Sequence, residues 1–303
     1  MVYTVTLNPA LDYVMRVGGL RYDDINRSDS EDIFYGGKGI NVSVILSRLG
    51  VENEALGFVG GFTGDKLVQM LESDGIKSDF NRLSGGYTRI NVKIKADTEL
   101  DVNAQGPSVS DDEIESLLKK LGETEKGDIL VLAGSIPKNL PSDFYERILA
   151  GLQNKGVHFV VDATGDLLKK CLSYEPFLVK PNHHELGDLF GVETKTLEQI
   201  VLYAKKLQQL GARNVLVSRG KDGATLVDEK GGVTTLENIE GKPVSSVGCG
   251  DSMVAGFIAG YLEKEDYAYA LKLGMACGNA TVFSEQLAQK NEIDKIFDYY
   301  KNL

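Results

Sequence analysis

The segment with the clearest chemical pattern lies at residues 245–257, where Gly248 and Gly250 surround Cys249 and stand directly before Asp251. Apolar residues spaced three and four apart follow, which predicts a helix that begins at this turn. A glycine turn that opens a helix leaves backbone N–H groups unpaired, with the positive end of the helix dipole behind them. The segment therefore predicts a binding site for an anion such as phosphate.

Asp251 has two interpretations. As a residue at the start of a helix it could be an N-cap, a position that Asp often occupies. Beside an anion-binding turn its carboxylate could instead be a general base, which accepts a hydroxyl proton as a phosphoryl group is transferred. The two roles are compatible, and the sequence leaves both open.

A second glycine-rich segment lies at residues 34–43, where Gly36, Gly37 and Gly39 surround Lys38. Three glycines let the backbone approach a ligand closely, and the helix expected after them adds a favourable potential for an anion. A flexible loop without function is the alternative. Three familiar motifs are absent: Gly-x-x-x-x-Gly-Lys-Ser/Thr, Gly-x-Gly-x-x-Gly after the first strand, and Gly-x-Ser-x-Gly. The sequence thus gives no support to a P-loop enzyme, a dinucleotide-dependent oxidoreductase or a hydrolase with that elbow.

These segments need a scaffold in which strands and helices alternate. Amphipathic helices are predicted at residues 42–49 and 114–121. Short apolar runs predict strands at residues 129–132, 159–161, 177–179 and 215–217. Such runs are typical of a parallel sheet with helices on both faces. We therefore predict a doubly wound, Rossmann-like α/β core with a mainly parallel sheet.

Two stretches, residues 11–35 and 87–106, interrupt this alternation. Apolar and polar residues alternate within them, as at residues 88–94, which predicts a small sheet with one face in water. Inserted into the core, such a sheet could cover a cleft as a lid or form a dimerisation surface. No repeat or linker is evident, so we predict one domain over residues 1–303 with a β appendage.

Composition restricts the partners of this 303-residue chain. A formal net charge of −11 disfavours non-specific binding to nucleic acid. The apolar runs are too short to span a bilayer, and the N-terminus resembles no signal segment. Cys171, Cys249 and Cys277 lie far apart, which favours reduced thiols over disulfides or a zinc site. We predict a cytoplasmic protein without nucleic-acid or membrane partners.

Several segments, taken together and in this order, resemble the ribokinase-like family of carbohydrate kinases along essentially the whole chain. They are residues 6–12 (Thr-Leu-Asn-Pro-Ala-Leu-Asp), 36–41 (Gly-Gly-Lys-Gly-Ile-Asn), 180–185 (Lys-Pro-Asn-His-His-Glu), 248–251 (Gly-Cys-Gly-Asp) and 274–281 (Gly-Met-Ala-Cys-Gly-Asn-Ala-Thr). The resemblance implies a Rossmann-like core with a β lid, ATP as phosphoryl donor and Mg²⁺ as metal. It leaves activation by K⁺ open.

The resemblance assigns the catalytic roles to one turn. Gly248, Cys249 and Gly250 would form the anion hole for the transferring phosphoryl group, and Asp251 would be the base. Cys249 departs from the family, which has a smaller residue there. Because the backbone amide is retained, we expect an intact anion hole.

The resemblance also implies a nucleotide and metal side. Asn182 and Glu185 match the family's Asn-x-x-Glu element, which is linked to the metal and phosphates through water; Mg²⁺ needs few protein ligands. Glu185 could alternatively be a solvated charge in a first helical turn, and residues 221–223 an ordinary hairpin turn. The other nucleotide-binding candidates are Lys180, Ser218, Arg219, Gly220, Lys221, Asp222, Gly223, Asn279 and Ser284.

Family members that phosphorylate sugars already carrying a phosphate have the same opening as residues 6–12 and the same Gly-Gly-Lys-Gly loop. The resemblance to these members implies which residues bind the acceptor. Asp12 and Asn41 would bind sugar hydroxyls. Cations would bind the substrate phosphate, for which arginine is well shaped, although each could be a surface charge. The full set of substrate candidates is Asp12, Arg27, Gly37, Lys38, Asn41, Arg89, Asn103, Ser135 and Lys138.

Residues 88–94 and 181–186 are most similar to family members that convert fructose 1-phosphate to fructose 1,6-bisphosphate. Members that act on tagatose 6-phosphate or fructose 6-phosphate are the alternatives, because a sequence does not give pocket distances. A different class of answer is an inactive sensor of sugar phosphates, which the presence of Asp251, both turn glycines and the Asn-x-x-Glu element disfavours. An exposed edge of the lid sheet is compatible with a homodimer.

Overall fold

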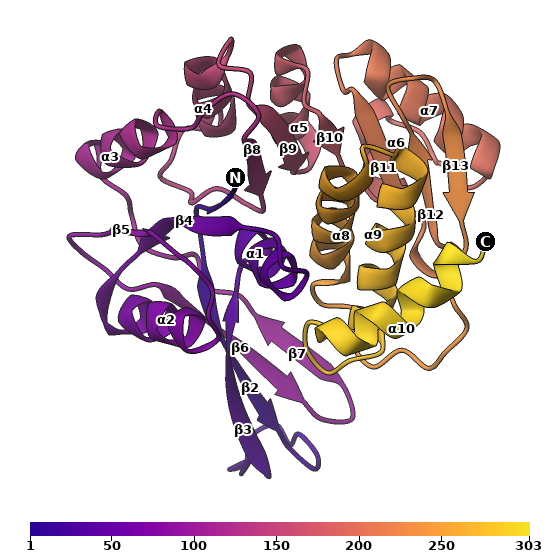
Figure 1. Ribbon diagram of the computed structural model, residues 1–303. Helices are drawn as coiled ribbons and strands as arrows, with labels where there is room; N and C mark the ends of the chain where they lie inside the picture. Colours follow the sequence, from indigo (N-terminus) through magenta and orange to yellow (C-terminus); the bar gives the residue numbers. More distant parts are fainter.

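The computed structural model describes residues 1–303 and contains two β-sheets and helices α1 to α10. Figure 1 shows the larger sheet among its helices and the smaller sheet projecting from one side of this core. The predicted mainly parallel α/β architecture is confirmed, and the smaller sheet is separate from it.

The larger sheet has nine strands and is parallel except at one edge. Its strands, in spatial order, are β13 (Val233–Leu236), β12 (Ala224–Val227), β11 (Asn214–Ser218), β10 (Leu178–Val179), β9 (His158–Asp162), β8 (Ile129–Ala133), β1 (Val2–Thr6), β4 (Asn53–Val59) and β5 (Asn81–Arg82). Only the pairings of β11 with β12 and of β12 with β13 are antiparallel. All five residues of β8 are buried, as expected for a strand with helices on both faces.

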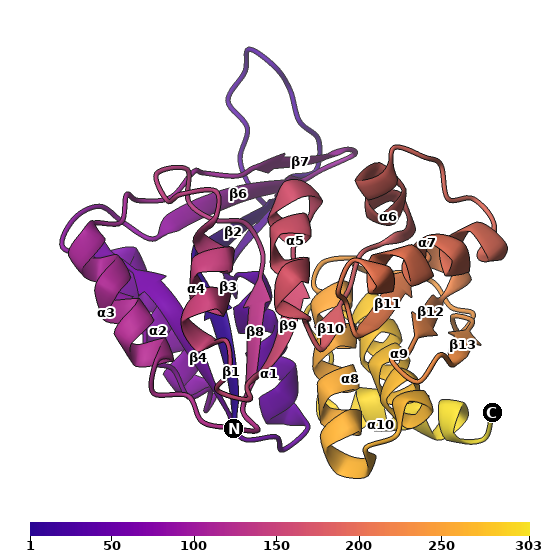
Figure 2. The same ribbon diagram turned by 90° about the horizontal axis from the view of Figure 1, so that it is seen from above.

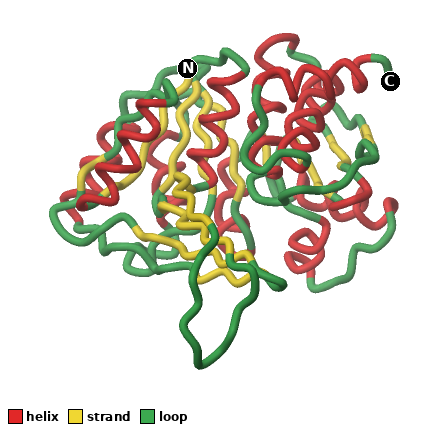
Figure 3. The backbone as a smooth tube through the Cα atoms, turned by 90° about the horizontal axis from the view of Figure 1, so that it is seen from below, coloured by secondary structure: helices red, strands yellow, loops and turns green.

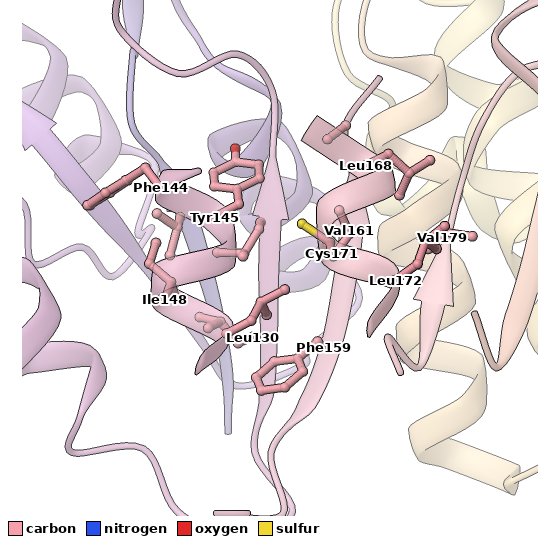
Figure 4. Close-up of a cluster of buried hydrophobic side chains, with 14 of the residues drawn as sticks. Leu130, Phe144, Tyr145, Ile148, Phe159, Val161, Leu168, Cys171, Leu172 and Val179 are labelled. Carbon is pink, nitrogen blue, oxygen red and sulfur yellow. The ribbon is translucent and has the colours of Figure 1, made fainter. Parts of the chain in front are cut away.

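One face of this sheet packs against five helices. They are α3 (Asp111–Leu121), α4 (Phe144–Leu152), α5 (Gly165–Cys171), α6 (His183–Phe190) and α7 (Leu197–Gln209). Figure 4 shows side chains of α4 and α5 meeting Leu130 of β8 and Phe159 of β9. The predicted helix at residues 114–121 lies within α3 and contributes Ile114, Leu117 and Leu121 to this cluster.

The other face buries the alternate strand residues, such as Ile129 and Val131 of β8. These pack against α1 (Lys38–Arg48), α8 (Cys249–Lys264), α9 (Tyr267–Val282) and α10 (Lys290–Lys301). The remaining helix, α2 (Gly61–Ser73), packs with α1 in a smaller cluster that also contains Leu11. None of the helices has the combination of length and apolar character that a membrane span requires.

The smaller sheet has the order β3-β2-β6-β7, and we call it the second sheet. Its strands are β2 (Ala10–Arg16), β3 (Ser30–Gly36), β6 (Arg89–Lys95) and β7 (Glu99–Val102). The two interrupting stretches of the sequence thus pair with each other, since β2 runs parallel to β6 with Asp12 opposite Asn91. Figures 2 and 3 show the loop between β2 and β3 projecting beyond this sheet.

Candidate active site

A cleft of about 1020 Å³ lies between the second sheet and the core. Strands β2, β3 and β6 supply one wall. The core supplies the other, through the start of α1, residues 133–136 at and after the end of β8, residues 162–164 at and after the end of β9, and residues 244, 245, 247, 248 and 251 around the start of α8. Cys249 and Gly250 are not among the lining residues. Carboxyl ends of parallel strands and amino ends of helices therefore meet in this cleft, as is usual for ligand sites in open α/β sheets.

The glycine turn at residues 248–251 forms the start of α8. Gly248 has φ +77°, a left-handed conformation that favours glycine. The N–H groups of Cys249, Gly250 and Asp251 donate to no backbone carbonyl, and only the adjacent thiol of Cys249 lies close to those of Cys249 and Gly250, so they remain available to an anion. Gly248 is the N-cap residue and Asp251 lies inside the first turn without a capping bond, so the capping interpretation of Asp251 is wrong.

Asp251 is only 6% exposed, and its Oδ2 accepts a 2.8 Å hydrogen bond from Nδ2 of Asn41. Burial raises the pKa of Asp251 to about 6, and the negative charge of Asp162 acts in the same direction. The hydrogen bond from Asn41 and the charges of Lys38 and Lys180 oppose that rise. The carboxyl group can therefore bind and release a proton close to neutral pH.

Asp162, at the end of β9, connects two predicted site residues and is itself absent from the sequence predictions. It is 2% exposed, with its oxygens 3.2 Å from Nζ of Lys38 and 3.6 Å from Nζ of Lys180. A Cβ at Gly250 would lie 3.1 Å from Nζ of Lys180, so this glycine leaves room for the lysine. A carboxylate directly after the apolar run 159–161 is the signal that could have identified Asp162.

The glycine-rich segment at residues 34–43 brings α1 against β1. A Cβ at Gly37, which has φ +136°, would lie 2.6 Å from Cγ2 of Thr6, and one at Gly39 would lie 2.5 Å from Oγ1 of Thr6. Only glycine fits such an approach. The segment forms the end of β3 and the start of α1, so the flexible-loop alternative is not supported, and it places Lys38 and Asn41 on the cleft wall.

Asp12 and Arg89 face the cleft from the second sheet. Oδ1 of Asp12 accepts a 2.8 Å hydrogen bond from Nδ2 of Asn91 on the paired strand. Nε and Nη1 of Arg89 donate, each over 3.1 Å, to the carbonyl oxygens of Asn8 and Ala104. Both side chains are therefore held in place by hydrogen bonds before any ligand binds.

The structure brings together most of the predicted acceptor residues and separates three from them. The cleft is lined by Asp12, Gly37, Lys38, Asn41, Arg89 and Ser135, together with Gly248 and Asp251. Arg27 lies in the loop between β2 and β3 and borders a separate hollow next to Met15 and Ile94. Asn103 and Lys138 are exposed in loops outside the cleft lining.

The predicted nucleotide-binding residues do not line this cleft. Ser218 ends β11, and the residues from Arg219 to Gly223 close the hairpin to β12 through a 2.7 Å bond from Arg219 N to Gly223 O. The hairpin alternative therefore describes this loop, and a Cβ at Gly223 would lie 2.0 Å from the carbonyl oxygen of Leu236. Gly220, Lys221 and Asp222 form a single 3₁₀ turn inside it.

Asn279 and Ser284 are occupied by contacts within the chain. The side chain of Asn279 is buried and bonds to Asn238, to the hydroxyl of Tyr300 and to backbone groups of Met275 and Ile239. Ser284 donates from Oγ to the carbonyl oxygen of Ala280 over 2.8 Å. Both residues thus have a clear structural role, whereas their nucleotide contacts stay a prediction.

Asn182 and Glu185 form a reciprocal capping box at the start of α6. Oδ1 of Asn182 accepts from Glu185 N and Oε2 of Glu185 accepts from Asn182 N, each over 2.8 Å. The chain contains no group of three or more His, Cys, Asp or Glu side chains arranged to hold a metal. Since Oε1 of Glu185 keeps no partner within the chain, the residues fit a metal ion that is bound through water.

Comparison with known proteins gives consistent matches along the chain. A family model described as pfkB family carbohydrate kinase matches residues 5–294. The chain is 43% identical to the 1-phosphofructokinase of Bacillus subtilis over 302 residues, which are 99% of each protein. It is 35% identical to the D-tagatose-1-phosphate kinase of Bacillus licheniformis over 298 residues, 97% of each. A solved structure of a putative phosphofructokinase from Staphylococcus aureus superposes with a TM-score of 0.88 at 40% identity, over 98% of this chain and 97% of that one.

Proposed function

The chain belongs to the pfkB family of carbohydrate kinases, and we propose that it transfers a phosphoryl group from ATP to a ketohexose phosphate, with fructose 1-phosphate as the preferred acceptor. Family membership confirms the resemblance that the order of the sequence motifs indicated. The names of both relatives place the acceptor phosphate on carbon 1. This favours fructose 1-phosphate over the 6-phosphate ketoses considered as alternatives.

The observation that carries the proposal is a buried carboxylate beside three unpaired N–H groups at the start of a helix. With a pKa of about 6, Asp251 is mostly ionised at neutral pH, so it can accept the proton of the attacking sugar hydroxyl. The N–H groups of Cys249, Gly250 and Asp251 would stabilise the charge on the transferring phosphoryl group. Base and anion hole are thus supplied by the same turn.

The acceptor would lie along the second sheet. Asp12 and Asn41 would bind sugar hydroxyls, and Lys38 and Arg89 would bind the substrate phosphate. Two nitrogens of Arg89 already bond backbone carbonyls, which leaves Nη2 as the donor for a phosphate oxygen. Gly37 and Ser135 would contact the same substrate. Contacts from Arg27, Asn103 and Lys138 would require their loops to move toward the cleft.

The donor side would hold ATP with Mg²⁺, a cofactor that supplies positive charge to the phosphates when it is bound. Glu185, together with Asn182, would hold the metal through water, and Lys180 would contact the nucleotide phosphates. The nucleotide itself would bind near the hairpin from Ser218 to Gly223 and near Asn279 and Ser284.

We further propose that residues 1–303 form one domain in which the second sheet is a lid, and that two copies associate through this sheet. The strand registers place the exposed residues Ile33, Ile90, Leu100 and Val102 on its face away from the cleft, and an exposed apolar face favours association. Ile90→Asp should convert a dimer into a monomer in sedimentation velocity; a monomeric wild type would contradict the proposal.

The three unpaired cysteines fit the proposed cytoplasmic location.

The deciding experiment is ADP release by the purified protein with MgATP at matched low concentrations of acceptors. These are fructose 1-phosphate, tagatose 1-phosphate, fructose 6-phosphate, tagatose 6-phosphate, and free fructose and ribose. We expect kcat/KM for fructose 1-phosphate to exceed the others by about tenfold or more. Preference for a 6-phosphate ketose would leave the proposed mechanism unchanged, but the acceptor would then bind in the cleft in the reversed orientation. Activity on neutral sugars alone would contradict the roles of Lys38 and Arg89.

A further inference from the structure

The carbonyl oxygen of Gly248, immediately before the proposed anion hole, is held by two donors from one residue. Ser252 donates to it from its backbone N–H over 2.8 Å and from its hydroxyl over 2.8 Å. A hydroxyl bond to the carbonyl four residues earlier is common in helices. Here it uses the only hydroxyl proton of Ser252, and this fixes the direction of the next bond.

The next bond runs to Thr281 on α9. Its Oγ1 lies 2.9 Å from Oγ of Ser252, and because Ser252 has no second proton, Thr281 must be the donor. Oγ1 of Thr281 in turn accepts from the backbone N–H of Ala288 over 3.2 Å. Ser252, Thr281 and Ala288 have no exposed surface, so water does not reach the bonds from Ala288 to Thr281 and from Thr281 to Ser252. The result is a chain of hydrogen bonds with one direction, from Ala288 through Thr281 and Ser252 to Gly248.

This chain determines where one anion-hole donor points. The carbonyl of Gly248 and the N–H of Cys249 belong to the same planar trans peptide and point in opposite directions. A hydrogen bond that fixes the direction of the carbonyl therefore also fixes the direction of the N–H. Gly248 has φ +77° and no side chain, so its peptide can tilt more freely when only the backbone N–H of Ser252, and not its hydroxyl, holds the carbonyl. We propose that Ser252 and Thr281 are positioning residues that hold the Cys249 N–H in line with the transferring phosphoryl group. The inference rests on the proposed function, because it assumes that the turn is an anion hole.

Such a role predicts a particular kinetic result. An anion-hole donor matters most when negative charge develops in the transition state, so misalignment should lower kcat and leave both KM values nearly unchanged. Removal of one such donor typically costs about 10²–10³-fold in kcat, so a donor that is misaligned but present should cost about tenfold. A defect that is only structural would instead lower stability or the amount of active enzyme.

The experiment compares four variants with wild type, using steady-state kinetics, active-site titration and thermal unfolding. Ser252→Ala should lower kcat about tenfold, and Thr281→Val, which keeps the volume but removes the hydroxyl, about threefold. Thr281→Ser keeps the hydroxyl and should restore wild-type kcat. The double variant Ser252→Ala, Thr281→Val should be no slower than Ser252→Ala alone, because both act through one chain of bonds.

Thr124→Val is the matched control, because Thr124 is a buried residue that also donates from its hydroxyl to a backbone carbonyl, that of Leu121, far from the cleft. It should lose a similar amount of stability and keep wild-type kcat. Wild-type kcat per active site in Ser252→Ala, or a kcat of Thr281→Ser that stays below the wild-type value, would overturn this inference and leave the proposed function standing. A wild-type protein inactive toward every acceptor would overturn the proposed function and the inference with it.

Discussion

The inner end of the cleft is built from buried groups on the core, whereas its outer end is built from half-exposed strands and loops. At the inner end, Asp251 and Asp162 are each less than a tenth exposed, and hydrogen bonds or ion pairs join them to α1 and to Lys180. At the outer end, Arg89 and Lys93 extend from β6 into the cleft, and Lys93 pairs with the exposed Asp101. The residues proposed for phosphoryl transfer are therefore more buried and more firmly held than those proposed to bind the acceptor.

The difference has a topological cause. In a parallel sheet the carboxyl ends of strands and the amino ends of the following helices lie at one edge, whatever the lengths of the connections. Residues at such positions meet because of the fold. A loop that leaves a sheet edge has no comparable constraint, so a cation on it can lie far from the cleft, as Arg27 does.

The largest effect expected at the inner end is that of Asp251→Asn. The amide cannot accept the hydroxyl proton, so kcat should fall on the order of 10²–10⁴-fold. The dissociation constant for the phosphosugar, measured by calorimetry, should stay close to the wild-type value. Turnover near the wild-type rate would remove Asp251 from its role and with it the contrast between the two ends.

Arg89→Ala and Lys138→Ala sharpen the contrast at the outer end. Arg89 lies in the cleft with one free nitrogen, so its loss should raise KM for the phosphosugar by about 10–100-fold and leave KM for ATP nearly unchanged. Lys138 is exposed outside the cleft lining, and its loss should change KM by less than about threefold. Equal effects of the two substitutions would mean that the loop of Lys138 closes onto the substrate.

The sequence predicts the fold, and the residues that come together at the inner end of the cleft, better than it predicts the residues that line the outer end. The strands within β8, β9, β10 and β11 could be identified because burial on both faces makes them continuously apolar. Asp162 could have been identified from its position directly after such an apolar strand, but it belongs to no recognised motif. By contrast, Asn103 and Arg27 lie in loops, and their positions depend on loop geometry that no residue pattern encodes.

The pH dependence of the wild-type enzyme tests the buried pair of carboxylates. The proposed base, Asp251, must be ionised and its pKa is raised to about 6, so kcat/KM for the acceptor should be constant above that pH and fall about tenfold per pH unit below it. Asp162→Asn removes a negative charge that raises this pKa, so the acid limb should move to lower pH. Lys138→Ala is the control and should leave the limb in place. An acid limb that stays in place or rises in Asp162→Asn would show that Asp251 is not the titrating group.

Glu185→Gln gives the smallest expected effect and separates two roles of one residue. Glutamine can replace glutamate in a capping box, as Gln199 does for Thr196 at the start of α7, so α6 and the melting temperature should be unchanged. If the carboxylate also holds water on Mg²⁺, half-saturation should need about tenfold more Mg²⁺. Glu292→Gln, in the capping box of α10, is the matched control and should not alter the Mg²⁺ requirement. An unchanged requirement in both variants would leave Glu185 as a helix cap alone, and the metal would then depend on the nucleotide phosphates rather than on α6.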